Sequence, residues 1–327
     1  MHRPVKYFEQ GLVYAAQAAW FVFSRINKQR SLMAMSIDIV KDLECLWAGG
    51  AICGEGLCWQ EEEQALYWVD IDGCKAHRYR LNGGVIDSWD LPEKTGWLLP
   101  CAGQSEWLAG CKSGVYLINL DSGSRELLVD PEPDLPGNRL NDAKIDIDGR
   151  LWAGTMNDEE KIETGWLYRI DCDLTCTRWD GPYITTNGPA MSPDNRVLYH
   201  VDTYGGIVYA FDKHRDGTID GRRIFARVDE GDGKPDGLTV DASGFVWLAH
   251  WGGSRITRFA PNGTVDGVLE IPAPQVTNCA FGGPDMNLLF ITTAARNIDL
   301  ETYPKAGGLF CVQTSVCGLS SPAFILG

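Results

Sequence analysis

The chain has few basic residues for its length and no cluster of them. Its 327 residues include 29 Lys and Arg against 44 Asp and Glu, a formal net charge of −15 at pH 7. Nucleic-acid binding relies on Lys and Arg gathered against phosphates, usually with interleaved aromatic residues. We therefore expect no nucleic-acid partner.

Cysteine patterns typical of disulfide scaffolds and zinc sites are also missing. The eleven cysteines are odd in number, include no C-x-x-C pair and fall mostly in apolar runs, where cysteine acts as a small hydrophobe. This pattern favours a reducing compartment, and we expect a cytoplasmic protein. The spacing of the five histidines matches no metal-binding motif. His200 and His250 lie in strand-like runs, and we expect both to have a structural role.

The apolar stretch at residues 11–24 is too short to span a bilayer, with 14 residues where about 20 are needed. It belongs to a basic stretch: the first 34 residues carry a net +4 and the remainder −19. A signal peptide and an amphipathic targeting helix are two interpretations. We favour an appended start, because no small-residue cleavage site follows. Residues 1–36 are therefore expected to be an extension, poorly ordered or a loosely packed helix, and residues 37–327 one domain.

Common enzyme motifs and long helical patterns are absent too. The sequence contains no G-x-S-x-G elbow and no phosphate-binding loop of the G-x-x-x-x-G-K-[ST] type. From Cys45 onward it shows no long amphipathic helical periodicity, which argues against an α/β fold.

What the chain does contain is a repeat. Six aromatic strand centres are separated by 40, 45, 47, 48 and 43 residues, the length of a four-stranded propeller blade. The centres are Tyr67, Trp107, Trp152, Tyr199, Trp247 and Phe290. Each unit continues into a further strand that alternates large apolar and polar residues, as half-buried antiparallel strands do. We predict an all-β, six-bladed β-propeller in which the strand around Glu44–Ala48 closes the last blade.

A polar residue precedes each aromatic centre by 11 or 12 positions. The six are Glu55, Thr95, Asn141, Asn187, Asp236 and Asn278. Because each begins the innermost strand of a blade, all six should point toward one end of the central channel. Carboxylate and amide oxygens suit a hard divalent cation, and Glu55, Asn187 and Asp236 could supply three of them. The alternative is that these residues only satisfy backbone groups at strand starts.

Several motifs resemble the senescence marker protein 30 (SMP-30)/gluconolactonase family. They include GEGLCW, RLNDAKIDIDGRLWAGTM, TNGPAMSPDNRVLYHVDT and GKPDGLTVDASGFVWLAHWGG. The resemblance extends from about Cys45 to the C-terminus. Within the family, the chain is most similar to bacterial sugar lactonases such as xylonolactonase. Members are six-bladed propellers that hydrolyse lactones with one divalent metal ion.

The resemblance implies roles for particular residues. Metal ligands would be Glu55, Asn187 and Asp236, and substrate contacts Arg139, Asn141 and Glu159, with Asp158 or Glu160 as alternatives to Glu159. The ion would be Ca²⁺, Zn²⁺, Mn²⁺ or Fe²⁺. Asp236 would also act as general base, while Arg139 and Asn141 orient the sugar hydroxyls and stabilise the oxyanion.

The expected reaction is metal-dependent hydrolysis of an aldono-1,4- or 1,5-lactone, such as xylonolactone, arabinonolactone or gluconolactone. A phosphotriesterase or arylesterase on the same fold and a noncatalytic calcium-binding propeller are the alternatives. The expected partner is a small sugar lactone, and the chain is expected to be a monomer or a weak homo-oligomer without a membrane span.

Overall fold

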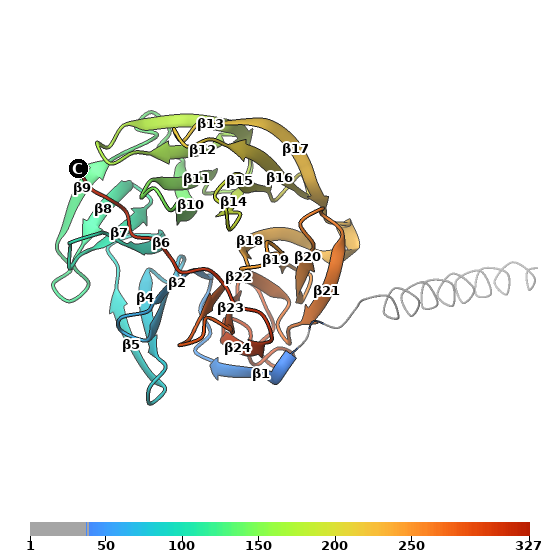
Figure 1. Cartoon of the computed structure of the whole chain (residues 1–327). Helices are drawn as coiled ribbons and strands as arrows, with labels where there is room; N and C mark the ends of the chain where they lie inside the picture. The colour runs from blue at the N-terminus through green and yellow to red at the C-terminus, as the bar shows by residue number, and fades with distance from the viewer. Residues whose placement is uncertain (1–36, 38) are drawn as a thin grey trace, which may run out of the picture.

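The computed structural model describes residues 37 and 39–327, and in this part of the chain antiparallel sheets surround a central axis (Figure 1). The N-terminal extension expected at residues 1–36 lies outside the described residues. No helix within the described part is long and apolar enough to cross a membrane.

Four separate sheets have four strands each, in sequence order. Their strands are β2 (Gly54–Gln60), β3 (Ala65–Asp70), β4 (Lys75–Arg80) and β5 (Val85–Asp90); β6 (Thr95–Pro100), β7 (Trp107–Cys111), β8 (Gly114–Ile118) and β9 (Arg125–Val129); β10 (Asn138–Ile145), β11 (Leu151–Asn157), β12 (Gly165–Ile170) and β13 (Cys176–Tyr183); and β14 (Thr186–Met191), β15 (Val197–Asp202), β16 (Ile207–Lys213) and β17 (Ile219–Arg227).

The remaining strands form two further units of the same kind, joined into one eight-stranded sheet by a single pairing of Trp251 with Gln275. Their strands are β18 (Lys234–Val240), β19 (Val246–Trp251), β20 (Arg255–Phe259) and β21 (Val265–Glu270), then β22 (Gln275–Gly282), β23 (Leu288–Ala294), β24 (Leu309–Thr314) and β1 (Ile39–Trp47). A short 3₁₀ helix, η1 (Glu230–Asp232), precedes β18.

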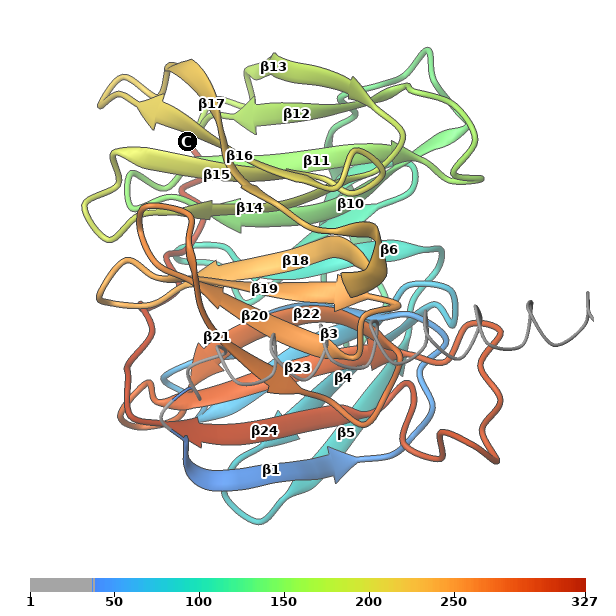
Figure 2. The ribbon, with the colours of Figure 1, turned by 90° about the vertical axis from the view of Figure 1, so that its right-hand side faces the viewer.

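The N-terminal strand closes the ring, as predicted. β1 pairs antiparallel with β24, the third strand of the last unit, and lies beside it in the side view (Figure 2). The first and last described strands therefore share one sheet. The predicted β-propeller with an N-terminal closing strand is confirmed.

Hydrophobic packing between neighbouring sheets holds the ring together. In the described residues, each of six buried apolar clusters is built mainly from two adjacent blades. The cluster containing Val201, Val208, Leu238 and Leu248, for example, joins the β14–β17 sheet to the β18–β21 unit. Because every sheet buries both faces in this way, a blade that detached from its neighbours would expose two apolar surfaces to water.

In the third and fifth blades an aspartate fixes the turn between the first two strands. In the third blade Asp146 accepts hydrogen bonds from the backbone of Asp148 and Arg150, and from the Trp152 indole at 3.1 Å. Asp241 does the same in the fifth blade, where it binds the Trp247 indole at 3.0 Å. Two of the predicted aromatic centres, Trp152 and Trp247, are therefore tied to the turns that precede them.

The C-terminal segment crosses one face of the ring. It leaves the last blade, where Gly318 N–H donates to Met286 O at 2.7 Å, and reaches the second blade, where Phe324 N–H donates to Pro100 O at 2.9 Å (Figure 1). The Phe324 side chain is fully buried in the cluster between the second and third blades. This segment therefore links the last blade to the second and third blades.

Removing the Phe324 ring should weaken the whole propeller. Phe324→Ala leaves a cavity in a closed cluster and should lower the free energy of unfolding by about 3–5 kcal/mol, measured by denaturant titration. The neighbouring Ile325 is 48% exposed, so Ile325→Ala should cost less than about 1 kcal/mol. Equal effects of the two substitutions would show that the segment is not anchored through Phe324.

The buried histidines serve the core, as expected. His200 is fully buried on β15, its ring nitrogens have no partner among the described residues, and burial lowers its pKa to about 3. His250 on β19 is also buried, and burial lowers its pKa to about 4. Both rings are therefore neutral in the folded protein at neutral pH.

A depressed histidine pKa makes stability fall on acidification. Between pH 6.5 and pH 5 the unfolded chain gains a proton at His200 that the folded chain does not, which should remove about 1.5 kcal/mol of stability. His200→Leu should reduce the loss of stability by this amount and leave the part due to His250, as measured by urea unfolding at each pH. An unchanged loss of stability in His200→Leu would contradict a neutral, buried His200 ring.

Candidate metal and substrate site

The six polar residues predicted to converge all lie on innermost strands, and each sits at an irregularity of its strand. The register of every first strand against its second shifts next to this residue, for example between Glu55 and Cys58 on β2 and between Asn187 and Ala190 on β14. A β-bulge re-aims a side chain out of the regular alternation. At Glu55, Asn141, Asn187 and Asp236 the bulge directs the polar group toward the channel.

Glycines next to these residues allow the inner strands to approach one another. Gly56, which follows Glu55, has φ +61°, and a Cβ there would lie 2.6 Å from Gly96 O on the adjacent β6. A Cβ on Gly237, which follows Asp236, would lie 2.5 Å from the Asn278 amide. Only glycine avoids both contacts, so the G-E-G and P-D-G motifs are requirements of close packing around the axis.

A cavity of about 90 Å³ opens at this end of the channel. It gathers five of the predicted site residues: Glu55, Arg139, Asn141, Asn187 and Asp236. Thr95 and Asn278, which the sequence left without a role, do not line it. Thr95 donates its hydroxyl to Glu93 O at 3.1 Å, whereas Asn278 supports the site from behind.

The carboxyl groups of the site are buried together. Burial and the nearby charge of Asp142 raise the pKa of Glu55 well above its ordinary value. Burial, followed by the charges of Glu55 and Asp142, does the same to the pKa of Asp236. Two buried carboxylates that are shielded from water repel each other strongly. A cation between them would lower the pKa of both and stabilise the site.

A chain of hydrogen bonds sets the orientation of the amides. Arg139 Nη1 donates to Asn141 Oδ1 at 2.7 Å, and Asn141 Nδ2 donates to Asn187 Oδ1 at 3.0 Å. Asn187 Nδ2 in turn donates to the Thr203 hydroxyl at 2.9 Å. The Asn187 carbonyl oxygen is thereby turned toward Asn141. Its second lone pair accepts no hydrogen bond from the described residues and is available to a ligand.

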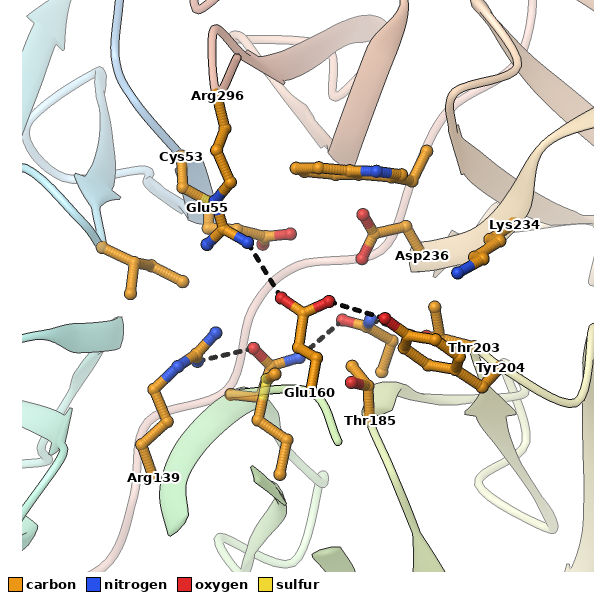
Figure 3. A pocket seen from close by; sticks show the side chains of 15 residues that line it. Cys53, Glu55, Arg139, Glu160, Thr185, Thr203, Tyr204, Lys234, Asp236 and Arg296 are labelled. Carbon is orange, nitrogen blue, oxygen red and sulfur yellow. Dashed lines mark hydrogen bonds and ion pairs between the residues drawn. The ribbon is translucent and has the colours of Figure 1, made fainter. Parts of the chain in front are cut away.

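The donor set fits a hard divalent cation. Both hydrogen bonds to the Glu55 carboxylate, from Gly56 N–H and Asn278 Nδ2, go to Oε2, so Oε1 accepts none from the described residues. Asp236 faces Glu55 across the cavity (Figure 3). No group of three or more His, Cys, Asp and Glu placed to hold a metal occurs in the described part of the chain. The candidate set is therefore two carboxylates and an amide, all oxygen ligands.

The structure places Glu159, the expected substrate contact, outside the cavity. Its side chain is 72% exposed and pairs with Lys161, away from the cavity. The next residue, Glu160, lines the cavity and accepts hydrogen bonds from Arg296 Nη1 at 2.8 Å and from the Tyr204 hydroxyl at 2.9 Å (Figure 3). Glu160 has φ +56°, and this left-handed turn decides which of the two glutamates faces inward.

Sequence reasoning missed three further residues at the mouth, Lys234, Tyr204 and Arg296. The Lys234 ammonium lies 3.7 Å from the centre of the Tyr204 ring, and Arg296 Nε donates to Asp72 at 2.9 Å. The sequence could have indicated Lys234 as a site residue, because it comes two positions before the predicted ligand Asp236. Arg296 and Tyr204 lie in loops of other blades, where no repeat register marks them.

Arg139 is held from behind by an ion pair. Its Nε donates to Asp158 Oδ1 at 3.2 Å, and Asp158 also binds Lys94 and Lys112. Burial opposes ionisation of Asp158, but these ammonium groups outweigh it and lower its pKa to about 2. The Nη2 group of Arg139 makes no hydrogen bond to the described residues and is free to bind a ligand.

The two adjacent glutamates allow a paired test of the site. Glu160→Ala removes a carboxylate from the cavity wall and should raise KM for a substrate about tenfold, the cost of one hydrogen bond to a charged group. Glu159→Ala, one residue earlier and exposed, should leave KM unchanged. Steady-state kinetics measures both, and the opposite ranking would contradict the placement of this loop.

Comparison with known proteins agrees with the β-propeller fold. The chain is an all-β propeller whose polar cavity lies at one channel end, and the family model for the SMP-30/gluconolactonase/LRE-like region matches residues 53–295. The chain therefore belongs to the SMP-30/gluconolactonase/LRE-like family.

Individual relatives match over nearly their whole length. The 6-deoxy-6-sulfogluconolactonase of Pseudomonas putida is 32% identical over 289 residues, which cover 86% of this chain and 98% of the relative. The L-arabinolactonase of Azospirillum brasilense is 32% identical over 277 residues, or 83% and 91% of the two chains. The solved structure of regucalcin from Agrobacterium tumefaciens, described as a calcium-binding protein, has a TM-score of 0.84 at 27% identity and covers 89% and 99%.

Proposed function

We propose that this protein hydrolyses sugar lactones to aldonic acids with one bound divalent cation. The observation that carries the proposal is the burial of Glu55 and Asp236 around a cavity in which Asn187 supplies an amide oxygen. The lactonase names of the relatives support the substrate class. An aldono-1,4- or 1,5-lactone is the expected substrate.

Glu55, Asn187 and Asp236 would hold the cation. When bound, a divalent cation polarises the lactone carbonyl and lowers the pKa of an adjacent water. Asp236 accepts the proton of the attacking water, since its carboxylate lies at the cavity wall and binds no other side chain among the described residues. The proton then passes to the ring oxygen as the carbon–oxygen bond of the ring breaks, leaving a hydroxyl and a carboxylic acid.

The polar wall opposite would orient the sugar. Arg139 offers its free Nη2 group to the developing oxyanion or to a sugar hydroxyl. Asn141 has a narrower role than expected, because both of its N–H groups are used by Thr186 O and Asn187. It can accept a hydrogen bond from a hydroxyl through Oδ1, and it positions the Asn187 oxygen. Glu160 is the other acceptor at the mouth.

A panel of pentono- and hexonolactones, assayed with each metal and with a chelator, tests the proposal. Hydrolysis of sugar lactones that stops with the chelator and returns with Ca²⁺, Zn²⁺, Mn²⁺ or Fe²⁺ supports it. Turnover of phosphotriesters or aryl esters alone, or no turnover of any of these substrates, would contradict it.

Two isosteric substitutions separate the site from the fold. Asp236→Asn removes the proposed base and should lower kcat/KM about 100-fold or more, and Glu55→Gln should lower activity by weakening cation binding. Glu61→Gln, an exposed glutamate in the turn after β2, is the matched control and should change neither. Circular dichroism should show the same fold in all three variants. Wild-type rates in both site variants would show that the reaction occurs elsewhere.

A further inference from the structure

Asn278 lies behind the proposed cation site with its amide fixed in one orientation. It is fully buried on β22, and its Oδ1 accepts a hydrogen bond from Cys279 N–H at 2.8 Å. Its Nδ2 must then face the other way, where it donates to Glu55 Oε2 at 2.8 Å and lies 3.4 Å from Asp142 Oδ2. One amide group therefore stands between two carboxylates, with one N–H for each.

Asp142 is a buried acid without an ion pair in the described part of the chain. It is 1% exposed and follows Asn141 at the bulge of β10. Its Oδ1 accepts a hydrogen bond from Ala143 N–H at 2.8 Å, and its Oδ2 faces Asn278. Burial raises the pKa of Asp142, and the charge of Lys144 opposes this without forming an ion pair. Burying a carboxylate outside an ion pair costs several kcal/mol, so a further cation nearby would compensate its charge.

We propose that Asn278 and Asp142 are positioning residues of the cation site. Asn278 holds Glu55 by Oε2 so that Oε1 is presented to the cavity, and Asp142 fixes the Asn278 amide and adds a third negative charge behind Glu55. This inference rests on the proposed function, because the positive charge it requires is the proposed divalent cation. Partners behind a metal ligand orient it and raise its basicity.

A purely structural role for these two residues predicts different behaviour. If they only satisfied backbone groups of the inner strands, their substitution would destabilise the protein and leave cation affinity unchanged. Thr95 provides the comparison, since it occupies the same register position in the second blade, is fully buried, and hydrogen-bonds away from the cavity.

The direct test is calorimetric titration of chelator-treated protein with Ca²⁺ and with Mn²⁺. Asn278→Ala and Asp142→Asn should each weaken binding of the cation by about 10- to 100-fold. Thr95→Val should change it less than twofold. At saturating cation, Asn278→Ala should recover activity with an unchanged KM for the lactone. Equal affinity in wild type and Asn278→Ala would overturn the inference.

Thermal unfolding with and without cation gives a second readout. Asp142→Asn removes one of three mutually repelling buried carboxylates, so the metal-free variant should melt at a higher temperature than metal-free wild type. Added cation should then raise its Tm less than it raises that of wild type. A lower Tm than wild type in both states would show a structural role and overturn the assignment of Asp142.

The outcomes also separate this inference from the function on which it rests. If wild-type protein binds no divalent cation, the proposed metal-dependent function fails and the inference fails with it. If wild type binds the cation and hydrolyses lactones while both variants bind equally well, only the positioning roles are wrong.

Discussion

The approach of six inner strands to one axis is the constraint on which the rest of the structure depends. Each first strand must pass close to its neighbours, which the contacts of Gly56 and Gly237 allow, and each bends at a bulge where its polar residue lies. A regular strand would turn these side chains alternately into the neighbouring blades. At Glu55, Asn141, Asn187 and Asp236 the bulges instead direct the side chain into one cavity, where oxygen atoms from blades far apart in the sequence meet.

Three buried acids make the centre of the ring strongly acidic. Glu55, Asp142 and Asp236 are buried near one another, and the cationic residues around them are largely committed elsewhere: Arg139 to Asp158, and Arg296 to Asp72 and Glu160. Burial raises the pKa of Asp142 and of Glu55, the charges of Lys144 and Arg139 oppose this, and no ion pair in the described residues neutralises any of the three acids. A bound cation, as proposed, would offset the cost of burying these acids at the centre of the ring.

The site differed from the sequence-based prediction where loops decide the geometry. Glu55, Asn187 and Asp236 follow the repeat register and lie at the cavity as predicted. Glu159 does not, because the loop after β11 turns through a left-handed conformation at Glu160, stabilised by Arg296 and Tyr204. Those partners come from other blades, so no local pattern could show which glutamate faces the cavity. Asn278 gained a role for the same reason: its partners Glu55 and Asp142 are 223 and 136 residues away.

The sequence by itself determined the repeat, the strands, the closure of the ring by the N-terminal strand and the register of the polar residues. These follow from local periodicity, turn residues and the equal spacing of aromatic centres, which each blade encodes independently. Tertiary structure alone decided which polar residues contact one another, which loop side chains line the cavity and how the C-terminal segment spans the ring. Such contacts depend on the angles between blades and on left-handed loop turns, which arise only when the ring has closed.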